Sequence, residues 1–350
     1  MKVDPKTWEK ETLHSNSNWA RCFSPTNIAL AKYWGKRDLE LNLPSNGSIS
    51  VCLQDFGTFT TVEVSKNFSE DILILNGKKE IRRTGQAFKK IDRVLDEVRS
   101  IAGVKTFVRI QTFNNFPTGA GLASSASGLS ALTIASTKAF GLDLPLEKLS
   151  EIARKGSGSA CRSFFDGYVE WKQGEKLDGS DSHGYPLKSH EHWPLLVAIA
   201  VVDSAEKDKP STTGMTVTEQ TSPYFKSWIL NAREQLDSIR TGIMQRDFLK
   251  LAELCESNCI RMHAAAMAAM PPIFYWKPKT LEVIEAVWAL RKLSFNVFFT
   301  IDAGPNVVIF YKGDSATKLV EALGRCNVGV LMTKVGPGAR ILEFNSGANN

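Results

Sequence analysis

The sequence predicts an α+β protein built from two lobes. Its 350 residues exceed the usual length of one domain, roughly 100–200 residues. Strand-like segments gather in the first part of the chain, and the last part has the order strand, turn, strand, helix, strand. A polar stretch rich in His and Gly at 178–192 lies between them. We therefore expect a first lobe at 1–192 and a second at 193–350.

In the first lobe, four segments have the β-branched and aromatic residues typical of strands. Asn76 and Gly77 follow the third segment and predict a hairpin turn. Apolar residues three and four positions apart predict a helix over 86–103, ended by Gly103. Another helix is expected after the glycine-rich stretch near 120, ending before Gly141. The four expected strands are 48–53, 58–64, 71–77 and 106–113.

The second lobe begins with ten apolar residues at 193–202, which predict a buried strand ended by Asp203. This run is too short to cross a bilayer, which takes about 20 residues. Residues 224–270 have the apolar spacing of helical hairpins. Further helices are expected at 279–293 and 316–325, and further strands at 296–302, 306–312 and 329–336.

Composition argues against several classes of function. The chain is 43% hydrophobic and 23% charged, as in ordinary globular proteins, and its charged N-terminus has no apolar signal-peptide core. The net charge of +6 permits polyanionic partners, but the basic cluster at 77–83 lacks the aromatic residues that single-strand binders use. The six cysteines form no CxxC pair, which favours reduced thiols and no metal site made by the protein alone. We expect a cytoplasmic protein without nucleic-acid or membrane partners.

The stretch FNNFPTGAGLASSASGLSAL (113–132) predicts an anion-binding loop, although it matches neither the Walker A nor the Rossmann spacing. Glycines in its turn allow an anion to approach the backbone closely. The helix that follows directs its N-terminal amides and its dipole towards the same place, which favours phosphate. The hydroxyls of Ser124 and Ser125 can bind phosphate oxygens or Mg²⁺. A small-residue helix packed tightly beneath a sheet is the alternative interpretation.

This loop, P-x-x-x-G-L-A-S-S-A, resembles the phosphate loop of the GHMP kinase superfamily, which binds ATP without a Walker lysine. Five further segments resemble the mevalonate diphosphate decarboxylases of that superfamily and occur in the same order. They are NIALAKYWGKRDLELNLPSNGSISVCL (27–53), GSGSACRSFFDGYVEW (156–171), DSAEKDKPSTTGM (203–215), MPPIFY (270–275) and DAGPN (302–306).

The resemblance implies a GHMP-kinase-like fold, with a ribosomal-protein-like N-terminal lobe and a ferredoxin-like C-terminal lobe around a deep cleft. It implies the ATP- and Mg²⁺-dependent decarboxylation of (R)-5-diphosphomevalonate to isopentenyl diphosphate, in the mevalonate pathway of isoprenoid biosynthesis. ATP would phosphorylate the tertiary 3-hydroxyl, and ADP, phosphate and CO₂ would be released. A homodimer is a further implication.

The resemblance also implies roles for particular residues. Asp302 would orient or deprotonate the 3-hydroxyl, with Lys32 beside it keeping the carboxylate ionised. Arg162 would hold the substrate carboxylate with its planar fork of donors, and Asn27 would face the substrate. The substrate's diphosphate would contact Tyr33, Lys36, Ser157, Gly158, Ser159, Ser211 and Met215, the last by its main chain. The ATP phosphates and Mg²⁺ would contact Pro117, Gly119, Ala120, Gly121, Leu122, Ala123, Ser124 and Ser125.

Two positions of the sequence depart from the family pattern. Thr212 stands where some bacterial relatives have a basic residue, and Asp166 replaces a usual Gly.

Three alternative functions remain. A phosphomevalonate decarboxylase would take the 5-monophosphate, and the sequence discriminates poorly between the two substrates. A mevalonate 3-kinase is disfavoured because such enzymes lack the Asp and Lys pair. An RNA-binding protein is disfavoured by dispersed basic residues and by the lack of RNP-like aromatics.

Overall fold

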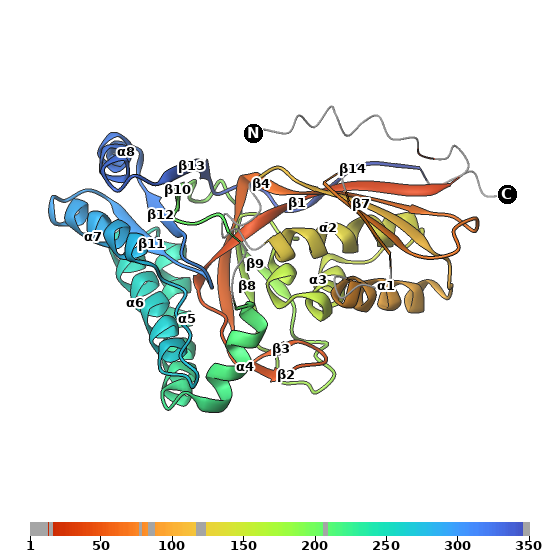
Figure 1. Ribbon diagram of the computed structural model, residues 1–350, viewed down its shortest axis with the longest axis horizontal. Helices are drawn as coiled ribbons and strands as arrows, with labels where there is room; N and C mark the ends of the chain where they lie inside the picture. Colours follow the sequence, from red (N-terminus) through yellow and green to blue (C-terminus); the bar gives the residue numbers. More distant parts are fainter. Residues whose placement is uncertain are drawn as a thin grey trace.

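The computed structural model describes residues 13, 17–76, 79–82, 88–116, 124–205 and 209–345. It has two lobes, each made of a β-sheet and helices (Figure 1). The expected α+β class and the two-lobed architecture are therefore confirmed. The turn of the expected phosphate loop, 117–123, lies outside the described residues.

Two long strands, β1 (Asn18–Ala31) and β4 (Ser48–Val64), form the centre of the N-terminal lobe. They pair antiparallel from Asn18–Val64 to Ala31–Ile49. The first part of β4 also pairs with β8, and its last part with β7. In the described chain this sheet has the order β14-β1-β4-β7-β5-β6, with β8 on β4 and β9 on β8. The remaining strands are β5 (Ile72–Leu75), β6 (Lys79–Arg82), β7 (Val108–Asn114), β8 (Tyr168–Trp171), β9 (Gly184–Lys188) and β14 (Arg340–Asn345).

The two strands expected at 48–53 and 58–64 are one continuous strand. The prediction of a break was wrong, although the pairing of β4 with β1 shifts register between Cys52 and Gly57. A Cβ at Gly57 would lie 2.4 Å from the carbonyl oxygen of Ser24, so the two backbones approach as closely as only glycine permits. The hairpin expected at Asn76 is confirmed, because β5 and β6 pair antiparallel from Ile72–Arg82 to Leu75–Lys79.

Helices α1 (Phe88–Ala102), α2 (Ser124–Ala139) and α3 (Leu146–Gly156) cover one face of this sheet (Figure 1). Small residues let α2 pack close beneath β1 and β4. Its Ser130 hydroxyl lies 2.6 Å from that of Ser24, and its Ser127 hydroxyl lies 2.7 Å from that of Thr58. The body of α2 is therefore a packing element, and only its first turn is exposed.

The C-terminal lobe is an antiparallel sheet with the order β11-β12-β10-β13 in the described chain. Alternate residues of β10 face opposite sides: Val197 and Ile199 pack with α5 and α6, and Ala198 and Ala200 with α7 and α8. The strands are β10 (Leu196–Val201), β11 (Val297–Thr300), β12 (Val307–Tyr311) and β13 (Gly329–Lys334). The helices are α5 (Phe225–Gln245), α6 (Phe248–Met267), α7 (Pro278–Lys292) and α8 (Ala316–Arg325).

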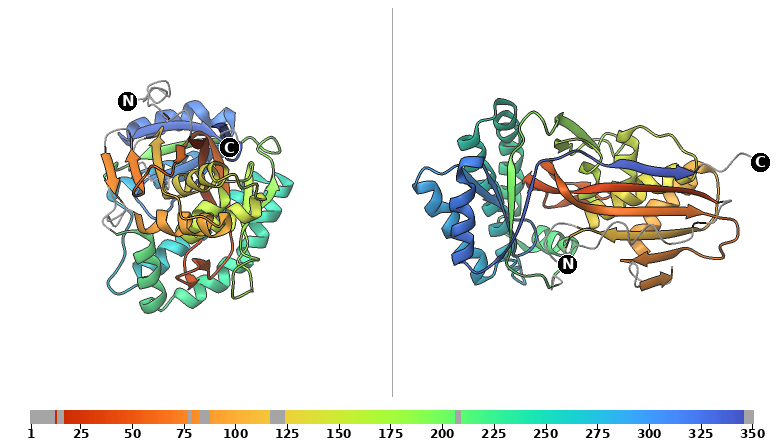
Figure 2. Two further views of the ribbon diagram at one scale, coloured as in Figure 1. Left: turned by 90° about the vertical axis from the view of Figure 1, so that its right-hand side faces the viewer. Right: turned by 90° about the horizontal axis from the view of Figure 1, so that it is seen from above.

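The two lobes share a hydrophobic core. Ile28 and Leu30 of β1 belong to the same buried cluster as Phe298 of β11. After β13 the chain returns to the first lobe, where β14 pairs with the outer side of β1 (Figure 2). The division of the chain into two lobes at residue 192 stays a prediction. The strand β14 lies after this position in the sequence but belongs to the sheet of the N-terminal lobe. The short strands β2 (Lys36–Asp38) and β3 (Leu43–Pro44) and the helix α4 (Ser211–Thr221) lie near the junction of the lobes (Figure 1).

The remaining strands and helices expected in the second lobe are confirmed, with ends that differ by a few residues. Of the helices described, none is both long and apolar enough to cross a membrane.

Candidate functional site

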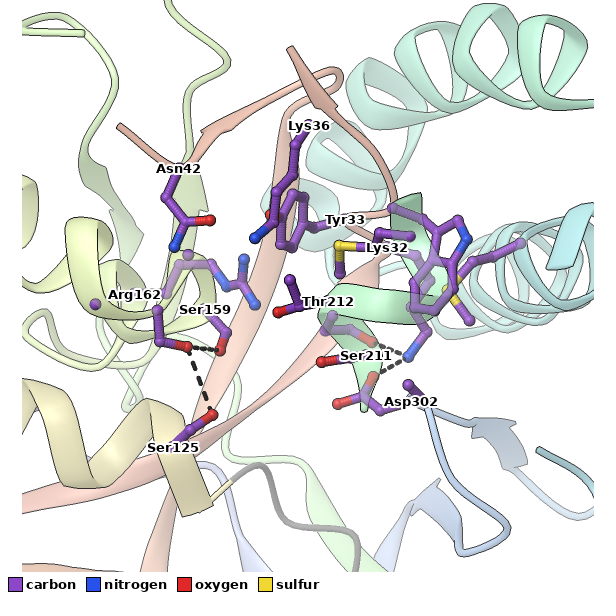
Figure 3. A pocket seen from close by; sticks show the side chains of 18 of the residues that line it. Lys32, Tyr33, Lys36, Asn42, Ser125, Ser159, Arg162, Ser211, Thr212 and Asp302 are labelled. Carbon is purple, nitrogen blue, oxygen red and sulfur yellow. Dashed lines mark hydrogen bonds and ion pairs between the residues drawn. The ribbon is translucent and has the colours of Figure 1, made fainter. Parts of the chain in front are cut away.

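A pocket opens where the two lobes meet, and residues from both lobes form its walls (Figure 3). Four of the described side chains in its wall are cationic and one is a carboxylate, so the pocket is suited to an anionic ligand. Its lining residues are Ala29, Lys32, Tyr33, Trp34, Lys36, Asn42, Lys90, Ser125, Gly156, Ser157, Gly158, Ser159, Arg162, Ser211, Thr212, Met215, Met262, Asp302 and Ala303.

Lys32 and Asp302 form an ion pair across the junction. Lys32 follows β1, Asp302 follows β11, and Lys32 Nζ lies 2.5 Å from Asp302 Oδ1. Lys32 Nζ also donates to the carbonyl oxygen of Ala29 at 3.0 Å. The Lys32 side chain is 2% exposed and that of Asp302 is 26% exposed, so the carboxylate faces the pocket and the ammonium lies behind it.

Helix α6 holds both members of this pair from behind. Asn258 accepts a hydrogen bond from the backbone N–H of Lys32 at 2.7 Å. A ring nitrogen of His263 lies 3.2 Å from the carbonyl oxygen of Ile301, the residue before Asp302. Burial lowers the pKa of His263 to about 3, so this ring is neutral and donates to the carbonyl. Cys259 also bonds to the backbone of Ile301.

Arg162 is a buried cation without a carboxylate partner among the described residues. Its guanidinium donates to the hydroxyls of Ser48 at 2.7 Å and Ser50 at 2.9 Å, and to the amide oxygen of Asn27 at 3.2 Å. It also lies over the ring of Trp171, 5.8 Å from its centroid. Burial lowers the pKa of Arg162 because these neutral acceptors do not replace the hydration of a charge. An anionic ligand would compensate for that loss.

Tyr33 lines the pocket, and its hydroxyl is available to form a hydrogen bond with a ligand. Its ring packs edge-on against Trp171 at 4.7 Å, and its buried hydroxyl has no hydrogen-bond partner among the described residues. Burial raises the pKa of Tyr33 well above its usual value, so the hydroxyl remains a proton donor. Gly158 makes this packing possible, since a Cβ there would lie 2.6 Å from Trp171 and 3.1 Å from the Tyr33 ring.

Serine hydroxyls line the pocket from three elements. Ser157 and Ser159, around the 3₁₀ turn Gly158–Arg162, have hydroxyls 3.3 Å apart. The hydroxyl of Ser157 lies 3.5 Å from that of Ser125 at the start of α2. Ser211 begins α4 on the opposite wall (Figure 3). Hydroxyls in this arrangement can donate to several oxygens of one phosphate chain.

Lys36 and Lys90 add positive charge at this pocket. Burial lowers the pKa of Lys36 from 10.5 to about 8, and the charges of Lys90 and Arg93 contribute to the shift. Desolvation at the pocket wall and the charge of Arg93 also lower the pKa of Lys90, although its side chain stays in contact with solvent. The described residues provide no carboxylate in an ion pair with either lysine.

The structure brings most of the expected site residues together. Asn27 instead lies behind Arg162: it is 1% exposed, and its amide nitrogen donates to Ser159 and Ser163. Ser124 is exposed beside the pocket, whereas Ser125 lines it. Of the expected ATP-phosphate residues, Pro117, Gly119, Ala120, Gly121, Leu122 and Ala123 lie outside the described residues. The departure at Asp166 lies elsewhere, where its carboxylate is 2.6 Å from His190.

Sequence reasoning missed several lining residues, among them Asn42 and Lys90. Asn42 has a buried amide oxygen without a hydrogen-bond partner among the described residues. The apolar spacing of α1 places Lys90 on the exposed face, as observed, but carries no signal that a pocket lies beside it. Ser48 and Ser50, the partners of Arg162, stand within a quoted motif, where alternate positions of a strand share one face.

A second, mainly apolar pocket adjoins the first. Ser125 and Lys90 line both of them, so the two spaces meet at the start of α2. Its other walls come from β4, β5, β7, α1 and α2: Thr60, Leu73, Leu75, Ile91, Ile110, Thr112, Gly128, Leu129 and Leu132. Across the described parts of the chain, no cluster of His, Cys, Asp or Glu is suited to holding a metal ion.

Two family models cover most of the chain. Residues 24–184 match the diphosphomevalonate decarboxylase-like N-terminal domain, and residues 197–341 match the mevalonate 5-diphosphate decarboxylase C-terminal domain. The diphosphomevalonate decarboxylase of Debaryomyces hansenii is 40% identical over 315 residues, 86% of this chain and 81% of the relative. That of Homo sapiens is 39% identical over 324 residues, 86% of this chain and 79% of the relative.

Solved structures of such enzymes have the same fold. The crystal structure of mevalonate diphosphate decarboxylase from Staphylococcus aureus has a TM-score of 0.87 and 35% identity, covering 93% of this chain and 98% of that chain. Another structure, described as a complex with MVAPP, AMPPCP and magnesium, has a TM-score of 0.85 and 36% identity, covering 93% of this chain and 99% of that chain. With both domain models matched, the chain belongs to the diphosphomevalonate decarboxylase family.

Proposed function

We propose that the pocket between the lobes is where this ATP-dependent decarboxylase binds (R)-5-diphosphomevalonate, and that Lys32, Arg162 and Asp302 act on it there. The enzyme forms isopentenyl diphosphate and releases ADP, phosphate and CO₂. The observation that carries the proposal is the ion pair of Lys32 with Asp302 beside Arg162, a buried cation that lacks an acidic partner.

Asp302 is the group that prepares the tertiary hydroxyl for phosphorylation. Its carboxylate is partly exposed to the pocket and can accept the hydrogen of the 3-hydroxyl, which orients the oxygen for attack on the γ-phosphate of ATP. The hydrogen bond from Lys32 holds one oxygen of this carboxylate in place. Because α6 holds the backbone on both sides of the pair, the geometry is in place before a substrate binds.

Arg162 binds the carboxylate that leaves as CO₂. A guanidinium fork matches a planar carboxylate with two parallel hydrogen bonds. Ser48, Ser50 and Asn27 fix the plane of the fork. Once the 3-phosphate departs, positive charge develops at C3 and the electrons of the C–C bond to the carboxylate form the new double bond.

The other end of the substrate lies among hydroxyls and cations. Ser157, Ser159, Ser211 and the unpaired hydroxyl of Tyr33 can donate to diphosphate oxygens, and Lys36 supplies charge. This set suits a diphosphate because each of its oxygens needs a donor once water is removed. Met215 lines the same wall and would contact the substrate through its main chain.

ATP fits at the start of α2. The helix N-terminus favours a phosphate group, and the adjoining apolar pocket suits a nucleotide base. Mg²⁺, when bound with ATP, neutralises the charge that develops on the transferred phosphoryl group. The phosphates themselves and the hydroxyls of Ser124 and Ser125 would hold it, which is consistent with the lack of an acidic metal cluster among the described residues.

We place the enzyme in the cytoplasm. All six cysteines are free and buried, and burial raises the pKa of Cys52 and Cys161 to about 12. Unpaired thiols are the usual state in a reducing compartment.

The test is a coupled assay of ADP formation together with CO₂ release on mevalonate, its 5-phosphate and its 5-diphosphate. The proposal predicts that both products form in equal amounts and that the 5-diphosphate gives the highest kcat/KM. ADP without CO₂ would indicate a 3-kinase, and a preference for the 5-phosphate would indicate a phosphomevalonate decarboxylase. Either result would overturn the proposal.

A further inference from the structure

The turn that carries Asp302 is held at its far end by the side chain of Asn306. This turn, DAGPN (302–306), joins β11 to β12. Asn306 is 4% exposed, although asparagine side chains usually lie at the surface. A buried amide group requires hydrogen-bond partners, and those partners show what the turn is attached to.

Three hydrogen bonds attach Asn306 to the end of β10. Its amide oxygen accepts from the backbone N–H of Val202 at 2.7 Å and from that of Asp203 at 2.9 Å. Its amide nitrogen donates to the carbonyl oxygen of Asp203 at 2.9 Å. The backbone pairing of β10 with β12 ends at Ala200 and Val307. The side chain of Asn306 therefore continues the connection between these strands beyond their last backbone pair.

The end of β10 leads to the helix that forms the opposite wall of the pocket. Asp203 is anchored a second time there, because its carboxylate forms an ion pair with Lys277, the residue before α7. The chain continues to α4, which begins at Ser211. Ser211 faces the substrate pocket (Figure 3), and Met215 of the same helix also lines it.

The turn also packs with α4 directly. Ala303, next to Asp302, belongs to the same buried cluster as Met215 of α4. Thr280 in the first turn of α7 donates to the carbonyl oxygen of Pro305 at 2.7 Å, which holds the remaining part of the turn. The catalytic carboxylate is thus carried by a short turn that β10, α4 and α7 hold together.

This arrangement relates the two ends of the bound substrate to each other. In the proposed function, Asp302 orients the 3-hydroxyl, while Ser211 and Met215 contact the diphosphate. One substrate molecule can make both sets of contacts only when the turn and α4 keep a fixed separation. A displacement of about 1 Å can lower the rate about 100-fold, even when it arises away from the reacting atoms. A residue that fixes this separation therefore affects turnover more than binding.

We propose that Asn306 is a positioning residue of this reaction. Its amide joins the turn of Asp302 to the end of β10, and so it aligns the carboxylate with the 3-hydroxyl of the bound substrate. The proposal rests on the proposed function. Asn306 is not among the described residues that line the pocket, so it acts through Asp302 and not on the substrate.

The test compares Asn306→Ala and Asn306→Asp with Asn296→Ala. Asn306→Ala removes all three hydrogen bonds, whereas Asn306→Asp keeps an acceptor for the two backbone N–H groups and loses the donor. Asn296 is the matched control, because it lies at the opposite end of β11 and bonds to Lys312 and Ser315 through its backbone.

The measured quantities are kcat, the KM values for 5-diphosphomevalonate and ATP, and the ratio of ADP to CO₂. Urea unfolding of each protein identifies a temperature at which all of them are folded, and the kinetics are measured there. A role in stability alone would lower the free energy of unfolding and leave the kcat of the folded enzyme unchanged.

Asn306→Ala is expected to lower kcat by about 10- to 100-fold, while the KM for 5-diphosphomevalonate changes by less than about threefold. Calorimetry should detect binding of 5-diphosphomevalonate with nearly the affinity of wild type. ADP and CO₂ should fall together, because the carboxylate acts before the phosphate leaves. Asn306→Asp should have a kcat between those of Asn306→Ala and wild type.

The proposal is overturned if folded Asn306→Ala turns over as fast as Asn296→Ala, since the side chain would then hold the fold alone. It is also overturned if KM rises while kcat is unchanged, or if ADP formation persists while CO₂ release fails. Failure of the proposed function itself is a separate result, because wild type and Asn296→Ala would then release no CO₂ from 5-diphosphomevalonate.

Discussion

Lys32 Nζ lies 2.5 Å from Asp302 Oδ1, and this ion pair joins the end of β1 in the first lobe to the turn after β11 in the second. The pair is formed by residues 270 positions apart in the sequence. Its position therefore depends on how the lobes pack, through the core shared by β1 and β11 and through Asn258 and His263 of α6. Asp302 is therefore positioned for catalysis only when the two lobes pack correctly against each other.

Ser125 is expected to matter more for ATP use than Ser124. Ser125 lines both pockets at the start of α2, whereas Ser124 does not line either. Ser125→Ala should lower kcat/KM for ATP by about 10- to 100-fold, which corresponds to losing roughly 1.5–3 kcal/mol of a charged hydrogen bond. Ser124→Ala should cause a smaller loss, and a larger loss there would reverse the assignment. The measurement is ATP-dependent turnover at saturating 5-diphosphomevalonate.

Arg162→Lys should be far from conservative. Lysine keeps the charge but cannot donate at once to the substrate carboxylate, Ser48, Ser50 and Asn27. We expect kcat/KM to fall at least about 100-fold with the 5-mono- and the 5-diphosphate alike, because both carry the same carboxylate. A loss confined to the 5-diphosphate would indicate that Arg162 contacts the diphosphate and not the carboxylate, which would contradict the assignment.

The dependence of kcat/KM on pH should reflect Lys36. The pKa of Lys36 is lowered to about 8, so the free enzyme loses this positive charge as the pH rises through that value. Below it the ammonium is protonated and attracts the diphosphate; above it the attraction is lost. We expect kcat/KM for 5-diphosphomevalonate to fall above about pH 8, and Lys36→Arg to move that fall to higher pH. An unchanged alkaline limb in Lys36→Arg would exclude Lys36 as its cause.

Gly158→Ala should destabilise the fold and weaken substrate binding together. The added Cβ would lie 2.6 Å from Trp171 and 3.1 Å from the ring of Tyr33, so one of these rings must move. Such overpacking costs about 1–3 kcal/mol in the free energy of unfolding. Gly324→Ala in α8 is the control, because a Cβ there meets nothing within 4 Å. Denaturant unfolding of both variants measures the difference, and equal stabilities would contradict the packing argument.

Local patterns in the sequence predicted most helices and strands because apolar spacing reports which face of an element is buried. β1 was missed as a strand: its last ten residues are all buried, so it shows no alternation, and it contains Pro25. β14 could not be paired from the sequence, since its partner β1 lies more than 300 positions away. Such pairings depend on tertiary packing, which local pattern does not encode.

The site was predictable where a residue stands in a family motif, as Lys32, Arg162 and Asp302 do. Lys90 was not, because it belongs to an ordinary amphipathic helix and becomes part of the pocket only where Gly156 lets α1 and α3 touch. The role of Asn27 differs in geometry from what its motif implies. It lies behind Arg162 and fixes the guanidinium, and the motif does not reveal that arrangement.

Single and double variants of the Lys32 and Asp302 pair test the central claim most directly. Asp302→Asn keeps the size of the side chain and its hydrogen bonding but removes the charge. Its CO₂ release should fall by roughly 10²–10⁴-fold, while calorimetry still detects binding of 5-diphosphomevalonate. Asp237→Asn on α5 is the control, because its exposed carboxylate pairs with Arg240 outside the pocket and its loss should leave turnover unchanged.

The decisive quantity is the turnover of Asp302→Asn, Lys32→Met and their double variant, compared as a cycle. If the pair acts as one unit, each single variant already disables phosphoryl transfer, and the double variant should be little slower than either single one. Near-normal CO₂ release by Asp302→Asn, or losses that multiply in the double variant, would contradict the assignment of these two residues as the catalytic pair.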